Sequence, residues 1–319
     1  MKILVTGGAG FIGSHLVARL LADGHEVAVI DNESTGVRDN VPASARYVKG
    51  DVASLADLEA VFAAGVDAVC HIAGQVSLIR SYTNAAIDLR TNVVGTLNVI
   101  QLCLKYRVAR LLYAGSMQAY GNTPVIPTPE DAPCVPASYY GITKYAAELY
   151  VRTTAERPDL ESAFNATCFR MYNVYGPRQS IDNPYQGVLG IFLGNVLRGE
   201  PITIYGDGVQ SRDFVFIDDV VEAWARALSN SASYGRIINL GSGRQTSINE
   251  LARLVVEVAG GGRPCPILHE AMRPGELRSV EADITRAREI LGWQPRISFE
   301  QGLAATAEWA ARSYVAVKP

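Results

Sequence analysis

A tyrosine and a lysine stand four residues apart in the stretch SYYGITK, residues 138–144. If this stretch opens a helix with Ser138 as its N-cap, Tyr140 and Lys144 share one helical face. A free phenol has a pKa of about 10 and is a poor base at neutral pH. Because a lysine ammonium one turn away favours the phenolate, we expect Lys144 to lower the pKa of Tyr140 and the pair to move protons. A tyrosine and a lysine paired by chance on a solvated helix are the alternative.

Glycines interrupt the first twenty residues, MKILVTGGAGFIGSHLVARL, between an apolar run and a pattern with helical spacing. They fit Gly8-x-Gly10-x-x-Gly13 and equally Gly7-x-x-Gly10-x-x-Gly13. A strand, a glycine turn and a helix are the context that a dinucleotide fingerprint requires. Glycines let the backbone approach a pyrophosphate, and the N-terminus of the helix offers free N–H groups to it. A glycine-rich turn without a ligand is the alternative.

Acidic and polar residues follow the ends of further predicted strands. The run EVAVI (26–30) reads as a strand that ends at Asp31, at about the distance where an acidic residue binds the adenosine ribose. A carboxylate repels a 2′-phosphate, which favours NAD over NADP; an aspartate that caps a turn is the alternative. We expect Asp51, after the next strand, to accept from the adenine amino group. Ser116 lies just past a later strand end, where parallel sheets bind ligands.

The spacing of apolar runs predicts an α/β fold. We expect strands at 3–5, 26–30, 46–48, 67–72, 110–113, 166–171 and 236–240, and amphipathic helices at 11–20 and 92–104. Strands that alternate with helices at this rhythm predict a Rossmann-type doubly wound parallel sheet. His71 is expected to be a packed strand residue. Beyond Asn173, glycine- and proline-rich punctuation indicates a second, smaller C-terminal lobe.

The overall composition excludes several classes of protein. The 319 residues are 48% hydrophobic and 19% charged with a formal net charge of −3, which gives no electrostatic footprint for nucleic acid or an anionic membrane. No apolar run reaches the ~18 to 20 residues of a membrane span, and the N-terminus enters a strand without a signal peptide. Five scattered cysteines without a C-x-x-C pair favour free thiols in the cytoplasm over disulfides, and we expect no metal site.

Assembled in this order, these residues resemble the extended short-chain dehydrogenase/reductases, and most of all their nucleotide-sugar epimerase and dehydratase branch. The resemblance runs from Lys2 to about Trp309, and further matching stretches are NVVGT (92–96), RMYNVYGPR (170–178), GDGVQSRDF (206–214), RPGE (273–276) and LGW (291–293). It implies a bound NAD and a homodimer in which helices beginning near Asn92 and Ser138 form a four-helix interface. It also implies an NAD-binding domain at 1–175, to which 210–245 return, and a nucleotide-sugar-binding lobe at 176–209 and 246–319.

The resemblance also implies roles for individual residues. Tyr140 is the general base and later the acid, Lys144 holds the nicotinamide ribose, and Ser116 hydrogen-bonds the reacting oxygen. The implied cofactor-binding residues are Gly7, Gly10, Phe11, Ile12, Gly13, Asp31, Asn32, Asp51, Val52, Ala73, Asn92, Tyr140 and Lys144. The implied substrate-binding residues are Ser116, Met117, Gln118, Asn173, Val188, Arg212, Arg273 and Glu276. The two arginines would clamp the nucleotide diphosphate; a solvated surface charge is the alternative for each taken alone.

The stretch SMQAYG (116–121) distinguishes among the reactions of the family. Sugar 4,6-dehydratases and nucleotide-glucuronate decarboxylases carry a glutamate two residues before the tyrosine that corresponds to Tyr120. Here Gln118 stands in its place, and an amide does not exchange a proton at neutral pH. No Cys/His pair matches the one used in 3,5-epimerisation. We therefore expect a 4-epimerase of a UDP-sugar that works through a transient 4-keto sugar.

The identity of the sugar and three other functions stay open. Val280 matches a position that is tyrosine in epimerases restricted to plain hexoses, so UDP-glucose, UDP-galactose and also the N-acetylhexosamine pair fit. UDP-glucuronate 4-epimerases resemble the chain too but typically have threonine where Asn173 stands. A nucleotide-sugar 4-ketoreductase would release its oxidised cofactor. A non-enzymatic nucleotide-sensing domain has no need of an intact Ser116, Tyr140 and Lys144.

Overall fold

A computed structural model describes residues 1–181, 187–272 and 278–317. Its strands are β1 (Lys2–Thr6), β2 (Glu26–Asp31), β3 (Arg46–Lys49), β4 (Ala68–His71), β5 (Arg110–Ser116), β6 (Asn165–Met171), β7 (Asn173–Tyr175), β8 (Ile202–Tyr205), β9 (Ser211–Arg212), β10 (Phe214–Phe216), β11 (Arg236–Leu240), β12 (Thr246–Ser247) and β13 (Ile267–Glu270). Its α-helices are α1 (Phe11–Ala22), α2 (Leu55–Phe62), α3 (Leu78–Thr83), α4 (Ala85–Leu89), α5 (Gly95–Lys105), α6 (Tyr139–Ala155), α7 (Val188–Arg198), α8 (Ile217–Leu228), α9 (Ile248–Ala259), α10 (Thr285–Leu291) and α11 (Phe299–Val317). Short 3-10 turns are η1 (Arg38–Asn40), η3 (Met117–Ala119) and η4 (Ser231–Ser233), and η2 (Arg90–Val94) is a π-helical turn. None of these helices, over the residues described, is long and apolar enough to cross a membrane.

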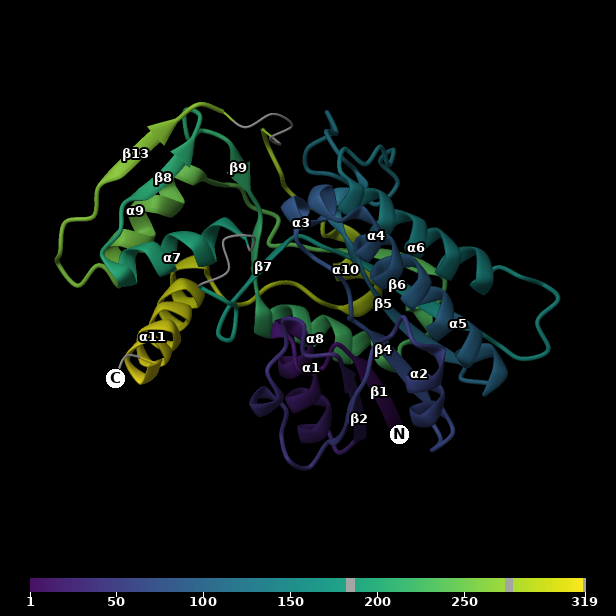
Figure 1. Ribbon diagram of the computed structural model, residues 1–319. Helices are drawn as coiled ribbons and strands as arrows, with labels where there is room; N and C mark the ends of the chain where they lie inside the picture. The colour runs from purple at the N-terminus through teal and green to yellow at the C-terminus, as the bar shows by residue number, and fades with distance from the viewer. Residues whose placement is uncertain (182–186, 273–277, 318–319) are drawn as a thin grey trace.

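Seven strands form one parallel sheet in the order β3-β2-β1-β4-β5-β6-β11 (Figure 1). The order reverses between β1 and β4, so the carboxyl ends of these two strands border a crevice. The predicted doubly wound α/β sheet is therefore confirmed, with a strand at each of the seven predicted places. The largest difference is that β5 runs on to Ser116, which is the last residue of the strand and does not lie past its end.

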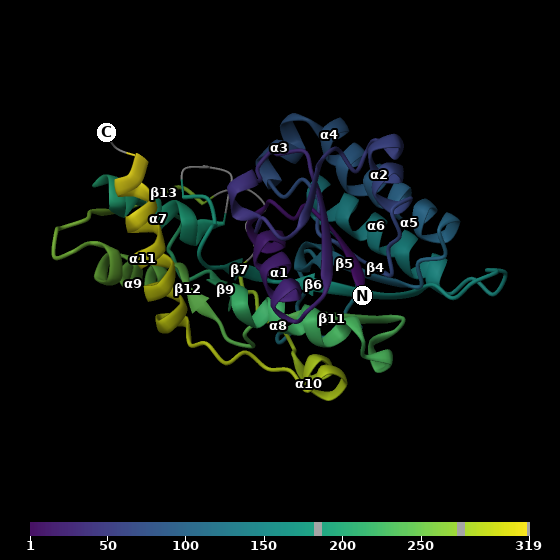
Figure 2. The ribbon, with the colours of Figure 1, turned by 90° about the horizontal axis from the view of Figure 1, so that it is seen from below.

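The two faces of the sheet bury different helices, because successive strand residues point to opposite sides. Ile3 and Val5 of β1 belong to one core together with residues of α1 and α8. Leu4 of the same strand belongs to a second core with residues of α2, α5 and α6. Figures 1 and 2 show these two helix layers on either side of the strands. The cysteines are free thiols as predicted, and three of the five are buried.

The elements that follow β7 gather beside the sheet as a smaller part of the molecule (Figure 1, left). Strand β8 pairs in parallel with β13, and α7, α9 and α11 pack against one another below this pair. Residues of α7, α9 and α11 belong to the same hydrophobic cluster as α1 and α8, so the apolar core continues from the sheet into this part. The division of the chain into two domains stays a prediction.

The helix predicted at 92–104 is not regular at its start. A π-helical turn, η2, comes first, and α5 begins only at Gly95. The wider turn is stabilised because the Thr96 hydroxyl donates to the Asn92 carbonyl at 2.6 Å. The Asn92 side chain is held as well, since its Oδ1 accepts from the Gln75 backbone N–H at 2.8 Å. Turns of this kind occur often at functional sites.

A buried ion pair fixes α6 on the sheet. The Arg170 guanidinium of β6 donates to both carboxylate oxygens of Glu148 on α6, at 2.6 and 2.9 Å. A third nitrogen of Arg170 donates to the Glu130 carbonyl at 3.1 Å. Both side chains of the pair are only 1% exposed. Removing one partner of such a pair leaves an uncompensated charge in the interior, which is far more costly than losing a surface pair.

We predict that Arg170→Met lowers the free energy of unfolding by about 3–5 kcal/mol, because the buried Glu148 then keeps only the Arg152 guanidinium, 3.9 Å away, as a cation. Arg157→Met is the matched control, since Arg157 pairs with Asp159 at the surface and such pairs contribute about 1 kcal/mol or less. Urea unfolding of both variants measures the difference. Equal losses in the two variants would contradict this role for the buried pair.

Candidate active site

The glycine turn after β1 is closed by contacts that leave no room for side chains. Gly7 has a φ of +70°, and a Cβ there would lie 2.8 Å from the backbone of Ala73. A Cβ on Gly13 would lie 2.1 Å from the Gly7 carbonyl oxygen, so α1 packs directly on the turn. Gly10 caps α1 without a side-chain bond from the described chain, and the first turn carries no acidic residue. Its free N–H groups therefore suit an anion, and the turn fits a pyrophosphate.

The end of β2 beside this turn carries negative charge. Asp31 accepts from the Ala9 N–H at 2.9 Å and from the Glu33 N–H at 2.8 Å, one bond to each carboxylate oxygen. Each oxygen keeps a further lone pair for a hydroxyl. The Lys49 ammonium on neighbouring β3 is paired with the Glu33 carboxylate at 2.7 Å. This strand end therefore suits a ribose diol better than a phosphate.

The other predicted cofactor-binding residues near the glycine turn differ in how far their side chains are buried and in the hydrogen bonds that they make. Phe11 and Ile12 are half-buried in the first turn of α1. Asn32 and Asp51 each accept a hydrogen bond from the backbone N–H two residues further on. The Val52 side chain is 4% exposed and packs in the core under α5. A ligand could meet Val52 only through its backbone.

Helix α6 begins beside the end of β5, and this places the predicted catalytic hydroxyls together. The Ser138 hydroxyl accepts from the Gly141 N–H at 3.0 Å, which confirms the predicted N-cap. A Cβ on Gly141 would lie 2.6 Å from the Gln118 carbonyl oxygen, so the first turn of α6 packs tightly on η3. The Tyr140 phenol thereby comes within reach of the Ser116 side chain.

Lys144 lies one turn further along α6 and is 5% exposed. Its ammonium nitrogen is 4.7 Å from the centre of the Tyr113 ring, and a Cβ on Gly74 would lie 3.5 Å from it. Burial lowers the pKa of Lys144 to about 8, and the Asp88 carboxylate opposes that change. Burial, together with the Lys144 charge, lowers the pKa of His71 to about 3, so this packed strand histidine is neutral.

The pKa of Tyr140 departs from the sequence-based prediction. Burial raises the pKa of the phenol, the hydrogen bond with Ser116 acts in the opposite direction, and the Asp88 charge adds to the rise. The expectation that Lys144 lowers this pKa is therefore wrong for the chain by itself, because removal from water outweighs the stabilisation of the phenolate. Within the described chain, Ser116 and Asp88 are the residues that act on the phenol.

Asn92 has protein partners for both ends of its amide. Its Oδ1 accepts from the Gln75 N–H, and its Nδ2 lies 3.1 Å from the Gln75 carbonyl, 3.1 Å from the Thr143 hydroxyl and 3.4 Å from an Asp88 carboxylate oxygen. These contacts tie η2 to α6, and the role of Asn92 in binding the cofactor stays a prediction. Ala73, the next predicted residue, has its N–H bonded to Thr6.

The predicted substrate residues lie on segments that border the same end of the sheet. Met117 is buried in a small apolar cluster with Val280, Tyr120 and Tyr172. Gln118 is half-buried, and its N–H donates to the Ser116 hydroxyl at 3.2 Å. The same segments line a cavity of about 340 Å³ formed by Gly121, Asn122, Thr123, Pro124, Ile126, Arg278 and Ser279.

Asn173 and Arg212 are linked through the residue that follows Arg212. The backbone N–H and the side-chain amide of Asn173 both donate to the Asp213 carbonyl, at 3.0 and 3.1 Å. An Arg212 nitrogen lies 2.7 Å from the Ser211 carbonyl oxygen. Val188 is the half-buried first residue of α7. Arg273 and Glu276, the other predicted substrate residues, lie outside the described residues.

Two buried carboxylates near the site escape the sequence-based prediction. Asp213 accepts from the N–H groups of Ser242, Gly243 and Ala282 and from the Ser242 hydroxyl, and so ties β9 to the segment that carries Val280. It could have been found from its place directly after Arg212 in the matching stretch GDGVQSRDF. Asp88 is fully buried between η2 and α6. Its only signal is that it stands four residues before Asn92.

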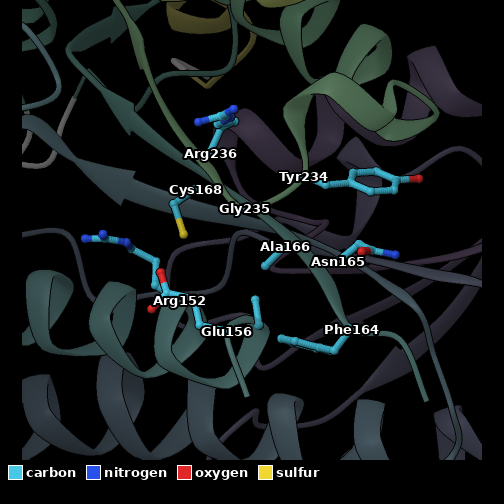
Figure 3. Close-up of a pocket in the computed structure, with 10 residues that line it drawn as sticks. Arg152, Glu156, Phe164, Asn165, Ala166, Cys168, Tyr234, Gly235 and Arg236 are labelled. Carbon is cyan, nitrogen blue, oxygen red and sulfur yellow. The ribbon is translucent and has the colours of Figure 1, made fainter. Parts of the chain in front are cut away.

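A cavity elsewhere in the molecule is separate from this site. It measures about 240 Å³ and is lined by Arg152, Ala155, Glu156, Phe164, Asn165, Ala166, Cys168, Tyr234, Gly235 and Arg236 (Figure 3). Most of its strand residues come from the beginnings of β6 and β11. Ser116 and the glycine turn lie at the opposite, carboxyl ends of their strands. The cavity is therefore not part of the candidate site.

Comparison with known proteins finds relatives along nearly the whole chain. Residues 3–241 match the NAD dependent epimerase/dehydratase family. The chain is 40% identical over 317 residues to a UDP-glucose 4-epimerase of Mycolicibacterium smegmatis, which covers 97% of this chain and 98% of the relative. A UDP-glucose 4-epimerase of Thermotoga maritima, crystallised with UDP-glucose, superposes with a TM-score of 0.93 at 38% identity over 98% of this chain and 100% of that one. One from Thermus thermophilus, in complex with NAD, gives 0.89 at 35% identity over 97% and 98%.

We predict that Ser116→Ala raises the pKa of the Tyr140 phenol further, because burial then acts without the opposing hydrogen bond. Ultraviolet difference titration of the phenolate measures this, with Tyr140→Phe as the background to subtract. A thermal unfolding curve of Ser116→Ala that matches the original protein shows that the fold is kept. An unchanged or lower pKa in a folded variant would show that Ser116 does not act on the phenol.

Proposed function

The chain belongs to the NAD dependent epimerase/dehydratase family, and we propose that it is an NAD-dependent 4-epimerase of a UDP-sugar. One observation carries this proposal: Tyr140, Ser116 and Lys144 meet at the same end of the sheet as the glycine turn. The UDP-glucose 4-epimerases of similar sequence and structure support it over nearly the whole length of the chain.

The residues around the crevice fit NAD. Gly7, Gly10 and Gly13 would let the pyrophosphate approach the backbone, and the first N–H groups of α1 would bind it. The free lone pairs of Asp31 would accept from the adenosine ribose, and its charge disfavours a 2′-phosphate. Lys144 would hold the nicotinamide ribose. When bound, NAD supplies a group that takes and returns a hydride.

The side chains at the carboxyl ends of the strands can take up and return the proton of the O4 hydroxyl when C4 is inverted. Tyr140 would take the proton of the O4 hydroxyl as the C4 hydrogen leaves with its electron pair, which yields a 4-keto sugar. Ser116 would hold the reacting oxygen through its hydroxyl. After the sugar turns its other face, the hydrogen returns to C4 and Tyr140 gives the proton back to O4. Atoms and electrons therefore balance over one turnover.

The substrate is anchored by groups that do not react. Arg212 on β9, and by resemblance Arg273, would clamp the diphosphate, since a guanidinium forks onto such oxygens. Asn173 would donate to the diphosphate or the sugar. The anchor can be the same for both epimers, so binding energy is placed in parts of the substrate that never change. The sugar itself stays free to rotate.

The neighbours of Ser116 argue against elimination reactions. Met117 is apolar and buried, and Gln118 is an amide, so neither can protonate a leaving hydroxyl. Val280 lies beside Met117 and is smaller than the tyrosine of hexose-restricted epimerases. We propose UDP-glucose and UDP-galactose as substrates, with the N-acetylhexosamine pair as further ones. UDP-glucuronate is the second candidate sugar, and a 4-ketoreductase is the second candidate reaction.

We also propose that the protein is a cytoplasmic homodimer. Exposed apolar side chains lie along α4, η2 and α6: Leu89, Val94, Ile142, Leu149 and Tyr150, each 40% or more exposed. Helices α5 and α6 lie side by side next to them (Figure 1). These side chains, on α6 and on the segment that leads into α5, suit pairing with the same side chains of a second copy into a four-helix bundle.

We predict that the purified protein, without added cofactor, converts UDP-glucose into its C4 epimer. UDP-N-acetylglucosamine and UDP-glucuronate, incubated separately, identify the preferred sugar by chromatography of the products. Tyr140→Phe should lower kcat by about 10²- to 10⁴-fold and still bind the UDP-sugar, since it lacks only the proton-transfer group. Tyr139→Phe, at the exposed neighbouring position, is the control and should keep its activity. Turnover that requires added NADPH would instead identify a ketoreductase.

We predict that Leu149→Arg makes the protein monomeric, because the charge would lie in the helix bundle. Light scattering should give twice the mass of one chain for the original protein and the mass of one chain for this variant. Val258→Arg on α9, where the original side chain is equally exposed at 40%, is the control and should stay dimeric. A monomeric mass for the original protein refutes the proposed dimer.

A further inference from the structure

Asp88 is a fully buried carboxylate held by hydrogen bonds from neutral groups. The Thr143 hydroxyl donates to its Oδ2 at 2.6 Å. The Gln75 side-chain amide donates to its Oδ1 at 2.6 Å, and the Asn92 amide lies 3.4 Å from the same oxygen. Asp88 itself is 0% exposed. Burying a carboxylate among neutral partners costs stability. The packing of the helices therefore does not by itself explain why an aspartate stands at this position.

The three partners of Asp88 come from the three segments that build the site. Gln75 follows the end of β4, Asn92 lies in the π-helical turn η2, and Thr143 stands on α6 between Tyr140 and Lys144. The Asn92 amide also lies 3.1 Å from the Thr143 hydroxyl, which can accept from it and donate to Asp88. The carboxylate thus joins the loop after β4, η2 and α6 at one point.

The charge of Asp88 also acts on the two groups that the proposed reaction uses. It raises the pKa of the Tyr140 phenol, in addition to the larger effect of burial. It raises the pKa of Lys144 as well and is the first of the groups that oppose the effect of burial there. Asp88 therefore helps to keep Lys144 protonated where burial alone favours the neutral amine.

We propose that Asp88 is a positioning residue for the reaction: its carboxylate clasps Gln75, Asn92 and Thr143 and supplies the negative charge that faces Tyr140 and Lys144. This inference rests on the proposed function. Asp88 touches neither the sugar nor the hydride. It acts by fixing the turn of α6 that carries both groups and by setting their charge states.

The other titratable groups around this turn lie on β4, β5, β6, α3, η2 and α6. His71 on β4 stays neutral, with a pKa of about 3. Tyr113 on β5 and Cys168 on β6 have their pKa values raised well above the ordinary range by burial. Glu148 on α6 is held by Arg170. Arg80 on α3 and Arg90 on η2 are exposed to solvent. Glu148 also raises the pKa of Lys144, but less than Asp88 does, and among the described groups Asp88 is the charge that acts on both Tyr140 and Lys144.

Asp88→Asn removes the charge and keeps the shape and a hydrogen-bond acceptor for Thr143. The pKa values of Tyr140 and Lys144 should both fall. The active form needs Tyr140 as phenolate and Lys144 as ammonium, so the kcat/KM profile is bell-shaped and its two limbs follow these two pKa values. Both limbs of the kcat/KM profile of the holoenzyme should therefore move to lower pH. Asp159→Asn, which neutralises an exposed aspartate, is the control and should leave both limbs in place.

Thr143→Val removes the hydrogen bond that Thr143 donates to Asp88 but keeps the charge of Asp88. It should lower kcat by roughly ten- to a hundredfold, because the turn of α6 that carries Tyr140 and Lys144 is displaced. The two limbs of the pH profile should not both move to lower pH, as they do in Asp88→Asn. Thr143→Ser keeps the hydroxyl and should restore most of the activity. This pair tests the clasp even if Asp88→Asn does not fold.

Ultraviolet titration of Tyr140 in holo Asp88→Asn needs no substrate, so it separates a failure of this inference from a failure of the proposed function. A fall in the phenol pKa supports the inference. A phenol pKa and pH limbs equal to those of the original protein, or limbs that move to higher pH, would overturn it. The absence of C4 inversion in the original protein at every pH would instead remove the proposed function.

Discussion

The close packing of α6 on the end of β5 is the constraint on which the rest of the site depends. A phenol and an ammonium must lie at the carboxyl end of a parallel sheet, out of bulk water, within reach of the crevice where the strand order reverses. The absence of a Cβ at Gly141 lets the helix start touch the Gln118 carbonyl, and this brings Tyr140 to Ser116. The buried Arg170–Glu148 pair fixes the same helix near its middle.

Burial opposes the charged forms that the two reactive groups need. Removal from water raises the pKa of Tyr140 and lowers that of Lys144, and both changes favour the neutral forms. The proposed chemistry needs a phenolate and an ammonium. The surrounding residues act against burial at each group separately: the Ser116 hydroxyl at the phenol and the Asp88 charge at the ammonium. His71 stays neutral and adds no competing positive charge.

The sheet, the glycine turn and the N-cap of α6 could be predicted from the sequence because each is set by local pattern. Apolar runs give the strands, Gly7 to Gly13 give the turn, and Ser138 gives the cap. The π-helical turn, the engaged amide of Asn92 and the clasp of Asp88 could not be predicted. They depend on Gln75 and Thr143, which come from other segments and meet η2 only after folding. The direction of the Tyr140 pKa was missed for the same reason, since burial is a property of the whole fold.

The central claim is that Tyr140 moves the proton of the O4 hydroxyl while the hydrogen on C4 leaves and returns as a hydride inside one closed site. The most direct test is to convert UDP-glucose that carries deuterium at C4 and to locate the label in the product by NMR. The account predicts that the deuterium stays on C4 of the inverted sugar, because the same hydrogen returns to the opposite face. Loss of the C4 deuterium to water would contradict it, since the base would then be removing the C–H proton and not the hydroxyl proton.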